Sequence, residues 1–296
     1  MIRSPLFYVG DKYKLVPQLL SYFPKNVKRY IEPFYGGGSS QLQVKADEYL
    51  LNDIDENIIR IHKMLVSYCG NENKFFSKLM YIIGKSGLSC SFLDDVVPKE
   101  LKKRYPKTYY SKFNKNSYDI LKKKYNSDKT DTILLYLLLI YGFNHMIRFN
   151  SKGEFNLPVG NVDYNKNVYD ALVNYFRLQT SRNLNFYNED YAKFLTKLDY
   201  KEGDFVYLDP PYLISMSEYN KFWNEENEKQ LYSILDWLND KGVKFGITNL
   251  LIHKGRENKI LQEWSQKYFV EKITSNYISF NDNTIKTDSV EIYVHN

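Results

Sequence analysis

The chain has 296 residues, of which 43% are hydrophobic, so it is long enough to bury one large core or two smaller ones. Residues 133–143 form its longest apolar run, which is too short to span a bilayer, and the N-terminus lacks the hydrophobic stretch of a secretory signal. Two cysteines and four scattered histidines predict neither a disulfide framework nor a zinc cluster. We therefore expect a cytoplasmic protein with no membrane segment and no bound metal.

Positive charge is concentrated in one segment. The chain carries a formal net charge of +6, whereas residues 101–129 hold ten Lys or Arg residues against two acids, Asp119 and Asp128. Six aromatic residues are interleaved with these charges: Tyr105, Tyr109, Tyr110, Phe113, Tyr118 and Tyr125. Basic and aromatic side chains together suit contact with the phosphates and sugars of a nucleic acid. The alternative is a solvated helix face whose aromatic side chains turn toward the core.

The N-terminal part predicts a helix, a strand and a glycine-rich turn. Residues 15–20 carry Leu and Val at helical spacing, and Pro17 falls in the first turn, where a helix tolerates it. Residues 29–32 predict the first strand, and the glycines at 36–38 predict a turn into a helix that begins near Ser39. Glycines let a backbone approach a ligand closely, although the same pattern also suits a tight loop.

A second strand is predicted at residues 50–53 and ends in Asp53. An acid about twenty residues after the first strand commonly accepts hydrogen bonds from ribose hydroxyls. Capping of the next helix by Asp53 or Asp55 is the alternative.

Residues 57–160 then interrupt the strand pattern. This segment is predicted to be mostly helical, with a buried apolar stretch at 136–140 and a hairpin near 143–160 whose basic tip is Ser151-Lys152-Gly153. Strands resume at 185–187, after which Asp190 either faces a ligand or caps the next helix. The remaining predicted elements are strands at 205–208, 243–247 and 290–294, and an amphipathic helix through 231–238 that ends at Gly242.

The strand at 205–208 ends in Asp209-Pro210-Pro211-Tyr212. Ligands of open parallel sheets bind beyond the carboxyl ends of the strands. The two prolines stiffen this turn and remove two backbone donors, which leaves carbonyls free to accept. A carboxylate, free carbonyls and an aromatic ring can hold a planar ring by an exocyclic amine while stacking on its face. An ordinary strand-to-loop turn is the alternative.

Three motifs occur in an order that resembles the Dam-type (D12 class, alpha-group) site-specific DNA adenine-N6 methyltransferases. They are Ile31-Glu32-Pro33-Phe34-Tyr35-Gly36-Gly37-Gly38-Ser39-Ser40, Arg-x-Asn-x-x-Gly-x-Phe-Asn-x-Pro-x-Gly at 148–160, and the Asp-Pro-Pro-Tyr motif. The resemblance runs from about Pro5 to Asn296. It implies an α/β fold in which a Rossmann-like methyltransferase sheet that binds S-adenosylmethionine (SAM), residues 1–56 and 161–296, carries an inserted, mostly helical DNA-recognition domain at 57–160.

The resemblance also assigns site residues. It implies that Tyr8 borders the cofactor and that Lys12 pairs with its carboxylate. The full set implied to hold SAM is Tyr8, Lys12, Glu32, Phe34, Gly36, Gly38, Asp53, Asp190 and Asp209, and the set implied for catalysis is Asp209, Pro210, Pro211 and Tyr212. The DNA contacts it implies are Phe143, Asn144, Met146, Arg148, Asn150 and Lys152, with Arg148 reading a base edge in the major groove. The chain departs from the family at Tyr8, where Trp is frequent, at Asp11, where Gly is frequent, and at Phe7, where some GATC-specific members carry Lys.

The implied function is methyl transfer from SAM to N6 of an adenine flipped out of duplex DNA, at GATC or a related short site. A loop with Tyr219, Asn220, Phe222 and Trp223 is expected over the target pocket. A monomer associated with the nucleoid, with a cognate restriction endonuclease as functional partner, fits this family. The alternatives are an RNA or protein-amide N-methyltransferase and a non-catalytic module that binds SAM or DNA.

Overall fold

The structure is a computed structural model that describes residues 1–94, 96–215, 223–274 and 289–296. The chain folds into two compact units. The helical unit comprises residues 1–11, 36–42 and 55–182, and the sheet unit comprises residues 12–35, 43–54 and 183–296.

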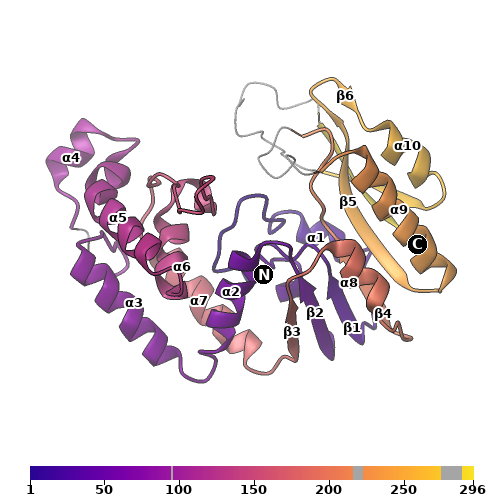
Figure 1. The fold of residues 1–296 in the computed structure, drawn as a ribbon, viewed down its shortest axis with the longest axis horizontal. Helices are drawn as coiled ribbons and strands as arrows, with labels where there is room; N and C mark the ends of the chain where they lie inside the picture. The colour runs from indigo at the N-terminus through magenta and orange to yellow at the C-terminus, as the bar shows by residue number, and fades with distance from the viewer. Residues whose placement is uncertain (95, 216–222, 275–288) are drawn as a thin grey trace. The chain divides into compact units, whose positions relative to one another are not determined.

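A mostly parallel sheet forms the centre of the sheet unit (Figure 1). Its strands lie in the order β3-β2-β1-β4-β5-β8-β7; β1 to β5 are parallel, and β8 runs antiparallel to both β5 and β7. The strands are β1 Arg29–Glu32, β2 Glu48–Asn52, β3 Leu184–Tyr187, β4 Asp204–Leu208, β5 Lys244–His253, β6 Arg256–Glu257, β7 Phe269–Ile273 and β8 Ser289–His295. This arrangement confirms the predicted mixed α/β fold with a mostly parallel central sheet.

Both faces of the sheet are covered, which explains why β4 is buried throughout. Val206 and Leu208 pack in the cluster that contains the apolar faces of α8 Tyr191–Lys197, α9 Glu225–Asp240 and α10 Lys259–Ser265. The alternate residue Tyr207 lies on the other face, where its ring centroid is 5.2 Å from that of Phe23, just after the short helix α1 Val16–Leu19.

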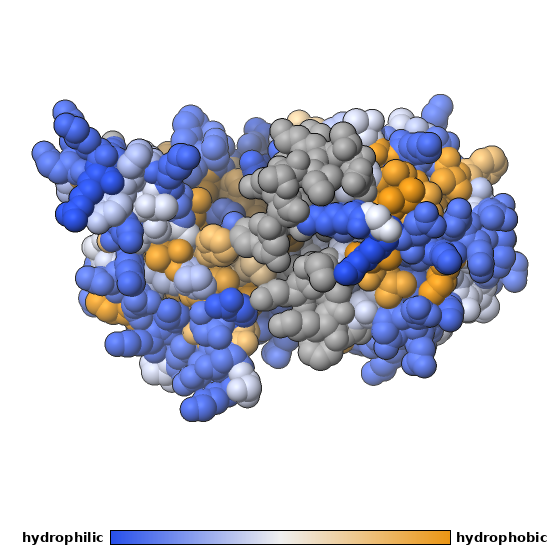
Figure 2. All heavy atoms as spheres, turned by 90° about the horizontal axis from the view of Figure 1, so that it is seen from above, coloured by the Kyte–Doolittle hydropathy of each residue, from blue (hydrophilic) through white to orange (hydrophobic). Residues whose placement is uncertain are grey.

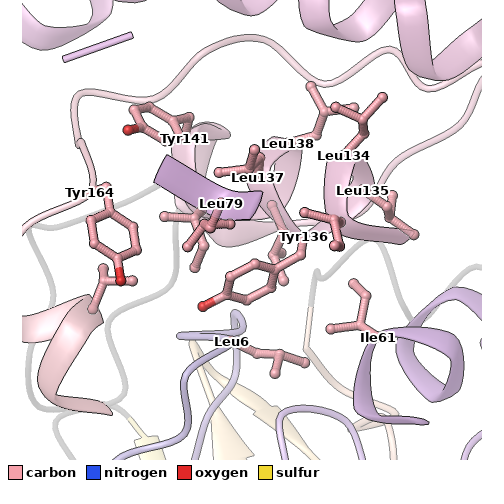
Figure 3. Packing of buried hydrophobic residues seen from close by; sticks show 14 of the residues in the cluster. Leu6, Ile61, Leu79, Leu134, Leu135, Tyr136, Leu137, Leu138, Tyr141 and Tyr164 are labelled. Carbon is pink, nitrogen blue, oxygen red and sulfur yellow. The ribbon is translucent and has the colours of Figure 1, made fainter. Parts of the chain in front are cut away.

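The helical unit is built around α6 Thr132–Tyr141, in which the nine residues after Thr132 are all buried. Asp131 caps this helix by accepting hydrogen bonds from the backbone N–H groups of the second and third residues that follow it. Figure 3 shows side chains from other parts of the unit, among them Leu6, Ile61 and Leu79, gathered around it. The other helices are α2 Glu56–Val66, α3 Glu72–Ser86, α4 Lys99–Arg104, α5 Tyr109–Ser127, α7 Lys166–Gln179 and the 3₁₀ turns η1 Gln41–Gln43 and η2 Phe143–His145.

One local prediction was wrong. A helix was expected from Ser39, but the chain makes only the single 3₁₀ turn η1. The carbonyl of Gln41, which a longer helix would use internally, accepts a hydrogen bond from Arg182 at 2.7 Å. The third strand, β3, ends at Tyr187, and Asp190 caps α8, which was one of the two alternatives for it.

Candidate active site

The carboxyl ends of the parallel strands carry the acids predicted from the sequence. Since β1, β2 and β4 are parallel neighbours, Glu32, Asp53 and Asp209 follow or end their strands at one edge of the sheet. Glu32 is buried, whereas Asp53 is half-buried. The sheet therefore brings these three predicted side chains to the same edge.

Asp209 is held through one of its two carboxylate oxygens. Oδ1 accepts hydrogen bonds from the hydroxyls of Tyr212 and Thr248, each at 2.9 Å, and lies 3.2 Å from the ammonium nitrogen of Lys12. Among the described residues, nothing donates to Oδ2, and 21% of the side chain is exposed. No hydrogen bond within the described ranges reaches the carbonyl of Pro210 either. Within the described part of the chain, Oδ2 and this carbonyl are thus two neighbouring acceptors without a donor.

The groups around Asp209 have opposite effects on its pKa. Burial raises the pKa of Asp209, and the neighbouring carboxylate of Glu291 adds to the rise, whereas the Lys12 ammonium and the hydrogen bonds from Tyr212 and Thr248 lower it. The net effect is a pKa above the usual value for Asp. Burial also raises the pKa of Tyr212, so this hydroxyl is a neutral donor.

Glu291 completes this cluster and was missed in the sequence. It lies on β8, with its side chain fully buried. Its Oε1 lies 3.4 Å from Lys12 and 2.8 Å from the hydroxyl of Tyr212, whose single hydrogen it shares with Asp209. An isolated acid in the apolar run 290–294 was the only available signal, because a charge on a buried strand face is rare without a partner. The sequence does not reveal its two partners, Lys12 and Tyr212, and even the nearer one, Tyr212, lies 79 residues away.

Asn52, the last residue of β2, joins the loops that follow β1 and β3. Its buried side chain donates hydrogen bonds to the carbonyls of Pro33 and Glu189, and its oxygen accepts from the N–H of Glu189, all at 3.0 Å. Beside it, Phe34 is half-buried and packs against the rings of Tyr191 at 5.2 Å and Trp223 at 5.8 Å. These contacts fix the loop after β1, where a cofactor was predicted.

In the helical unit, the glycine-rich turn is pinned from two sides. The Nε2 atom of His62, on α2, lies 2.9 Å from the carbonyl oxygen of Gly36, and the hydroxyl of Ser4 donates to the carbonyl of Gly37. His62 is fully buried, and this burial lowers its pKa to about 4, so the neutral ring donates through Nε2. A side chain on Gly37 would place its Cβ 3.1 Å from the Cβ of Tyr8. The turn is therefore fixed in a conformation that depends on glycine.

Two of the predicted cofactor residues have other partners in the structure. Lys12, expected to pair with the cofactor carboxylate, contacts Asp209 and Glu291, and its ammonium lies 4.6 Å above the ring of Tyr212. Asp190 accepts hydrogen bonds from two N–H groups at the start of α8, which was the alternative considered for it. Tyr212 itself is only 5% exposed, so its predicted stacking on a target base stays a prediction.

A short hairpin carries most of the predicted DNA contacts. Antiparallel bridges join Gly142 to Val159 and Phe149 to Phe155, and Gly153 turns with a left-handed φ of 67°. The side chain of Asn126 on α5 holds the hairpin through both backbone groups of Phe155.

Two of the predicted DNA contacts are engaged within this hairpin. The side chain of Arg148 donates to the side-chain oxygen of Asn156 at 2.9 Å and to its carbonyl at 3.0 Å. Asn150 uses its oxygen to bind the N–H groups of Lys152 and Glu154, so it organises the tip. Lys152 is exposed, Phe143 is 39% exposed, and Asn144 and Met146 are partly buried.

The basic segment forms α4, α5 and the turns beside them, and contact with a nucleic acid stays a prediction for it. Tyr118 and Tyr125 are buried against the core of the unit, as the alternative proposed. The exposed cations within this segment, residues 101–129, are Lys103, Arg104, Lys107, Lys112, Lys115, Lys123, Lys124 and Lys129. Figure 2 shows hydrophilic side chains covering the left end of the view, where α3 to α5 lie. Of the loop expected over the target pocket, Tyr219, Asn220 and Phe222 lie outside the described residues.

A family model described as D12 class N6 adenine-specific DNA methyltransferase matches residues 8–278, which include the glycine-rich turn, the hairpin and Asp209 with its turn. The chain belongs to this family. Membership implies a methyl donor as co-substrate. No helix among the described residues is long and apolar enough to cross a membrane, and no described group of His, Cys, Asp or Glu is arranged to hold a metal ion.

Individual relatives agree with this assignment. The chain is 30% identical to Type II methyltransferase M.FokI of Planomicrobium okeanokoites and to modification methylase StsI of Streptococcus sanguinis, over its whole length in both cases but over only 43% of theirs. It is 26% identical to DNA adenine methylase of Escherichia coli K12, with 96% of this chain and 92% of that protein aligned. The chain thus spans less than half the length of the first two relatives.

Proposed function

We propose that the protein transfers a methyl group from SAM to N6 of adenine in duplex DNA, at a short specific site. The observation that carries this proposal is a pair of acceptors on the turn after β4, Oδ2 of Asp209 and the carbonyl of Pro210, to which no described residue donates. The exocyclic amine of adenine has two N–H donors, and two fixed acceptors match them.

The residues on the sheet edge suit SAM. Glu32 and Asp53 supply acidic acceptors after parallel strands, which is the usual place for ribose hydroxyls, and Phe34 offers an aromatic surface beside them. Tyr8, Gly36 and Gly38 of the helical unit are further proposed cofactor residues, and Asp190 would contribute through its loop. SAM supplies the methyl group on a positively charged sulfur, and the anionic Asp209 cluster favours such a cation.

Catalysis would follow from orientation and charge rather than from strong base chemistry. The adenine amine is a poor nucleophile because its lone pair is delocalised into the ring. Hydrogen bonds from N6 to Asp209 and Pro210 would favour tetrahedral character at nitrogen and release the lone pair for in-line attack. Once methylated, N6 is cationic and acidic, so it can then lose a proton without a strong base.

Access to N6 requires the adenine to leave the base stack. We propose residues 57–160 as an inserted recognition domain, in which the hairpin presents Arg148 to a base edge and Lys152 to a phosphate. Phe143, Asn144 and Met146 would contact the opened duplex, and the exposed cations of α4 and α5 would bind the backbone. A cognate restriction endonuclease is a proposed functional partner, consistent with the naming of StsI as a modification methylase.

The test is transfer of tritiated methyl from SAM to unmethylated plasmid, followed by sequencing of the modified positions. The proposal predicts N6-methyladenine within one short motif. Label on RNA or on protein, but none on DNA, would contradict it and support the other methyltransferase classes. No label on any substrate, despite SAM binding, would support a non-catalytic module.

A further inference from the structure

A buried carboxylate, Glu291, and a partly exposed one, Asp209, share one ammonium and one hydroxyl in the Asp209 cluster. Lys12 lies 3.2 Å from Asp209 and 3.4 Å from Glu291, and the hydroxyl of Tyr212 lies 2.9 Å and 2.8 Å from the same two oxygens. The second oxygen of Glu291, Oε2, is buried and has no hydrogen-bond partner among the described residues. Burying a carboxylate in this way is costly, and an apolar residue would fill the same space on β8 more favourably.

We propose that Glu291 is a positioning residue for methyl transfer: it draws the Lys12 ammonium and the Tyr212 hydroxyl partly away from Asp209, so that Asp209 stays a strong acceptor for the adenine amine. This inference rests on the proposed function.

The physical reason lies in the balance of charge. If Lys12 faced Asp209 alone, one ammonium would neutralise one carboxylate, and Oδ2 would carry little negative charge toward a ligand. With Glu291 present, the same ammonium faces two carboxylates, and the cluster retains a net negative charge. The carboxylate of Glu291 also acts directly on Asp209, because it is one of the groups that raise its pKa.

The remaining groups around the cluster do not replace Glu291. The titratable groups that act on Asp209 are Lys12, Glu291 and Tyr212, from the segment before α1, from β8 and from the turn after β4. Thr248 of β5 contributes only a neutral hydroxyl. Glu32 of β1 and Tyr293 of β8 raise the pKa of the neighbouring Tyr207, and neither is among the groups that shift the pKa of Asp209.

The test compares steady-state methylation of a DNA substrate by wild type, Glu291→Gln and Glu291→Asp across pH. Gln keeps the size and the hydrogen-bond acceptor of Glu291 but removes its charge. We expect kcat to fall by about 10- to 100-fold, with the KM values for SAM and DNA changed by no more than about twofold. We also expect the acid limb of the kcat profile to move to lower pH in Glu291→Gln, whereas Glu291→Asp, which keeps the charge, retains the wild-type limb.

Glu228→Gln is the matched control, since Glu228 is also a buried carboxylate. It accepts hydrogen bonds from Trp223, Tyr232, Asn249 and Asn258. Its loss should lower stability without moving the acid limb. An acid limb and a kcat of Glu291→Gln equal to those of wild type would overturn the inference. A wild type that methylates no DNA adenine would instead defeat the proposed function.

A second variant supplies an independent measurement if Glu291→Gln does not fold. Carboxyl-¹³C aspartate can be titrated by NMR, with Asp209→Asn identifying the signal. The inference predicts a higher pKa of Asp209 in wild type than in Glu291→Met, which removes the charge and leaves no buried polar group in its place, and equal values would overturn it.

Discussion

His62 should make the protein sensitive to mild acid. Its ring is fully buried against the glycine-rich turn, and this burial lowers its pKa from 6.5 to about 4. Because the folded-state pKa lies below the unfolded one, the unfolded chain binds the extra proton as the pH falls. The stability that the neutral ring contributes is therefore fully present above pH 6.5 and is lost as the pH falls toward 4.

The size of the effect follows from the two pKa values. Between pH 7 and pH 5, the difference in proton binding between the folded and unfolded states lowers the free energy of unfolding by about 2 kcal/mol. The variant His62→Gln removes this titration, because Gln does not protonate, yet its amide can still donate to the carbonyl of Gly36. It should therefore lack this part of the acid sensitivity.

The assay is urea unfolding followed by circular dichroism at pH 7 and at pH 5. Wild type should lose about 2 kcal/mol more than His62→Gln between the two pH values. Asn73→Gln is the control, since Asn73 is an exposed residue of α3 without a titratable group, and it should lose as much as wild type. Equal losses in wild type and His62→Gln would refute the reasoning.

Three further substitutions test the packing and the DNA contacts. Gly142→Ala should lower the free energy of unfolding, measured by calorimetry, by about 1–3 kcal/mol, because the new Cβ would lie 2.5 Å from the carbonyl oxygen of Leu138. The control Gly84→Ala, whose Cβ would have nothing within 4 Å, should be neutral or stabilising. Equal effects of the two substitutions would contradict the predicted clash. Arg148→Ala should weaken binding to a duplex that carries the target site by about 1–3 kcal/mol and hardly change binding to other duplexes, both measured by fluorescence anisotropy. Equal losses for both kinds of duplex would argue against base readout. Lys152→Ala should weaken binding to all duplexes and reduce the slope of log affinity against log salt by about 0.9, and an unchanged slope would exclude a phosphate contact.

Local patterns predicted the motifs and the described strands other than β6 and β7, but not the partners of the site residues. The apolar run at 205–208 and the prolines after it indicate where β4 ends, because both signals are local. The pairing of Lys12 with Glu291 depends on β8 lying antiparallel beside β5, and periodicity does not reveal which strands are neighbours. For the same reason, Lys12 was assigned to the cofactor carboxylate and Glu291 was missed.

The glycine-rich turn illustrates a second limit. Its glycines are visible in the sequence, whereas the residues that pin it, Ser4 and His62, lie on either side of it in the chain and look like any polar residue of a loop or helix. The helix expected after Ser39 failed because Arg182, far along the chain, takes the carbonyl of Gln41. Tertiary hydrogen bonds here override a local preference.

The central claim is that Asp209 carries methyl transfer, and single-turnover transfer by Asp209→Ala tests it most directly. The rate should fall by at least about 100-fold while DNA affinity stays within about threefold of wild type, because the lost acceptor acts on the target amine rather than on the DNA backbone. Asp240→Ala, at an exposed carboxylate that ends α9, should keep the wild-type rate. Transfer by Asp209→Ala at the wild-type rate would contradict the account.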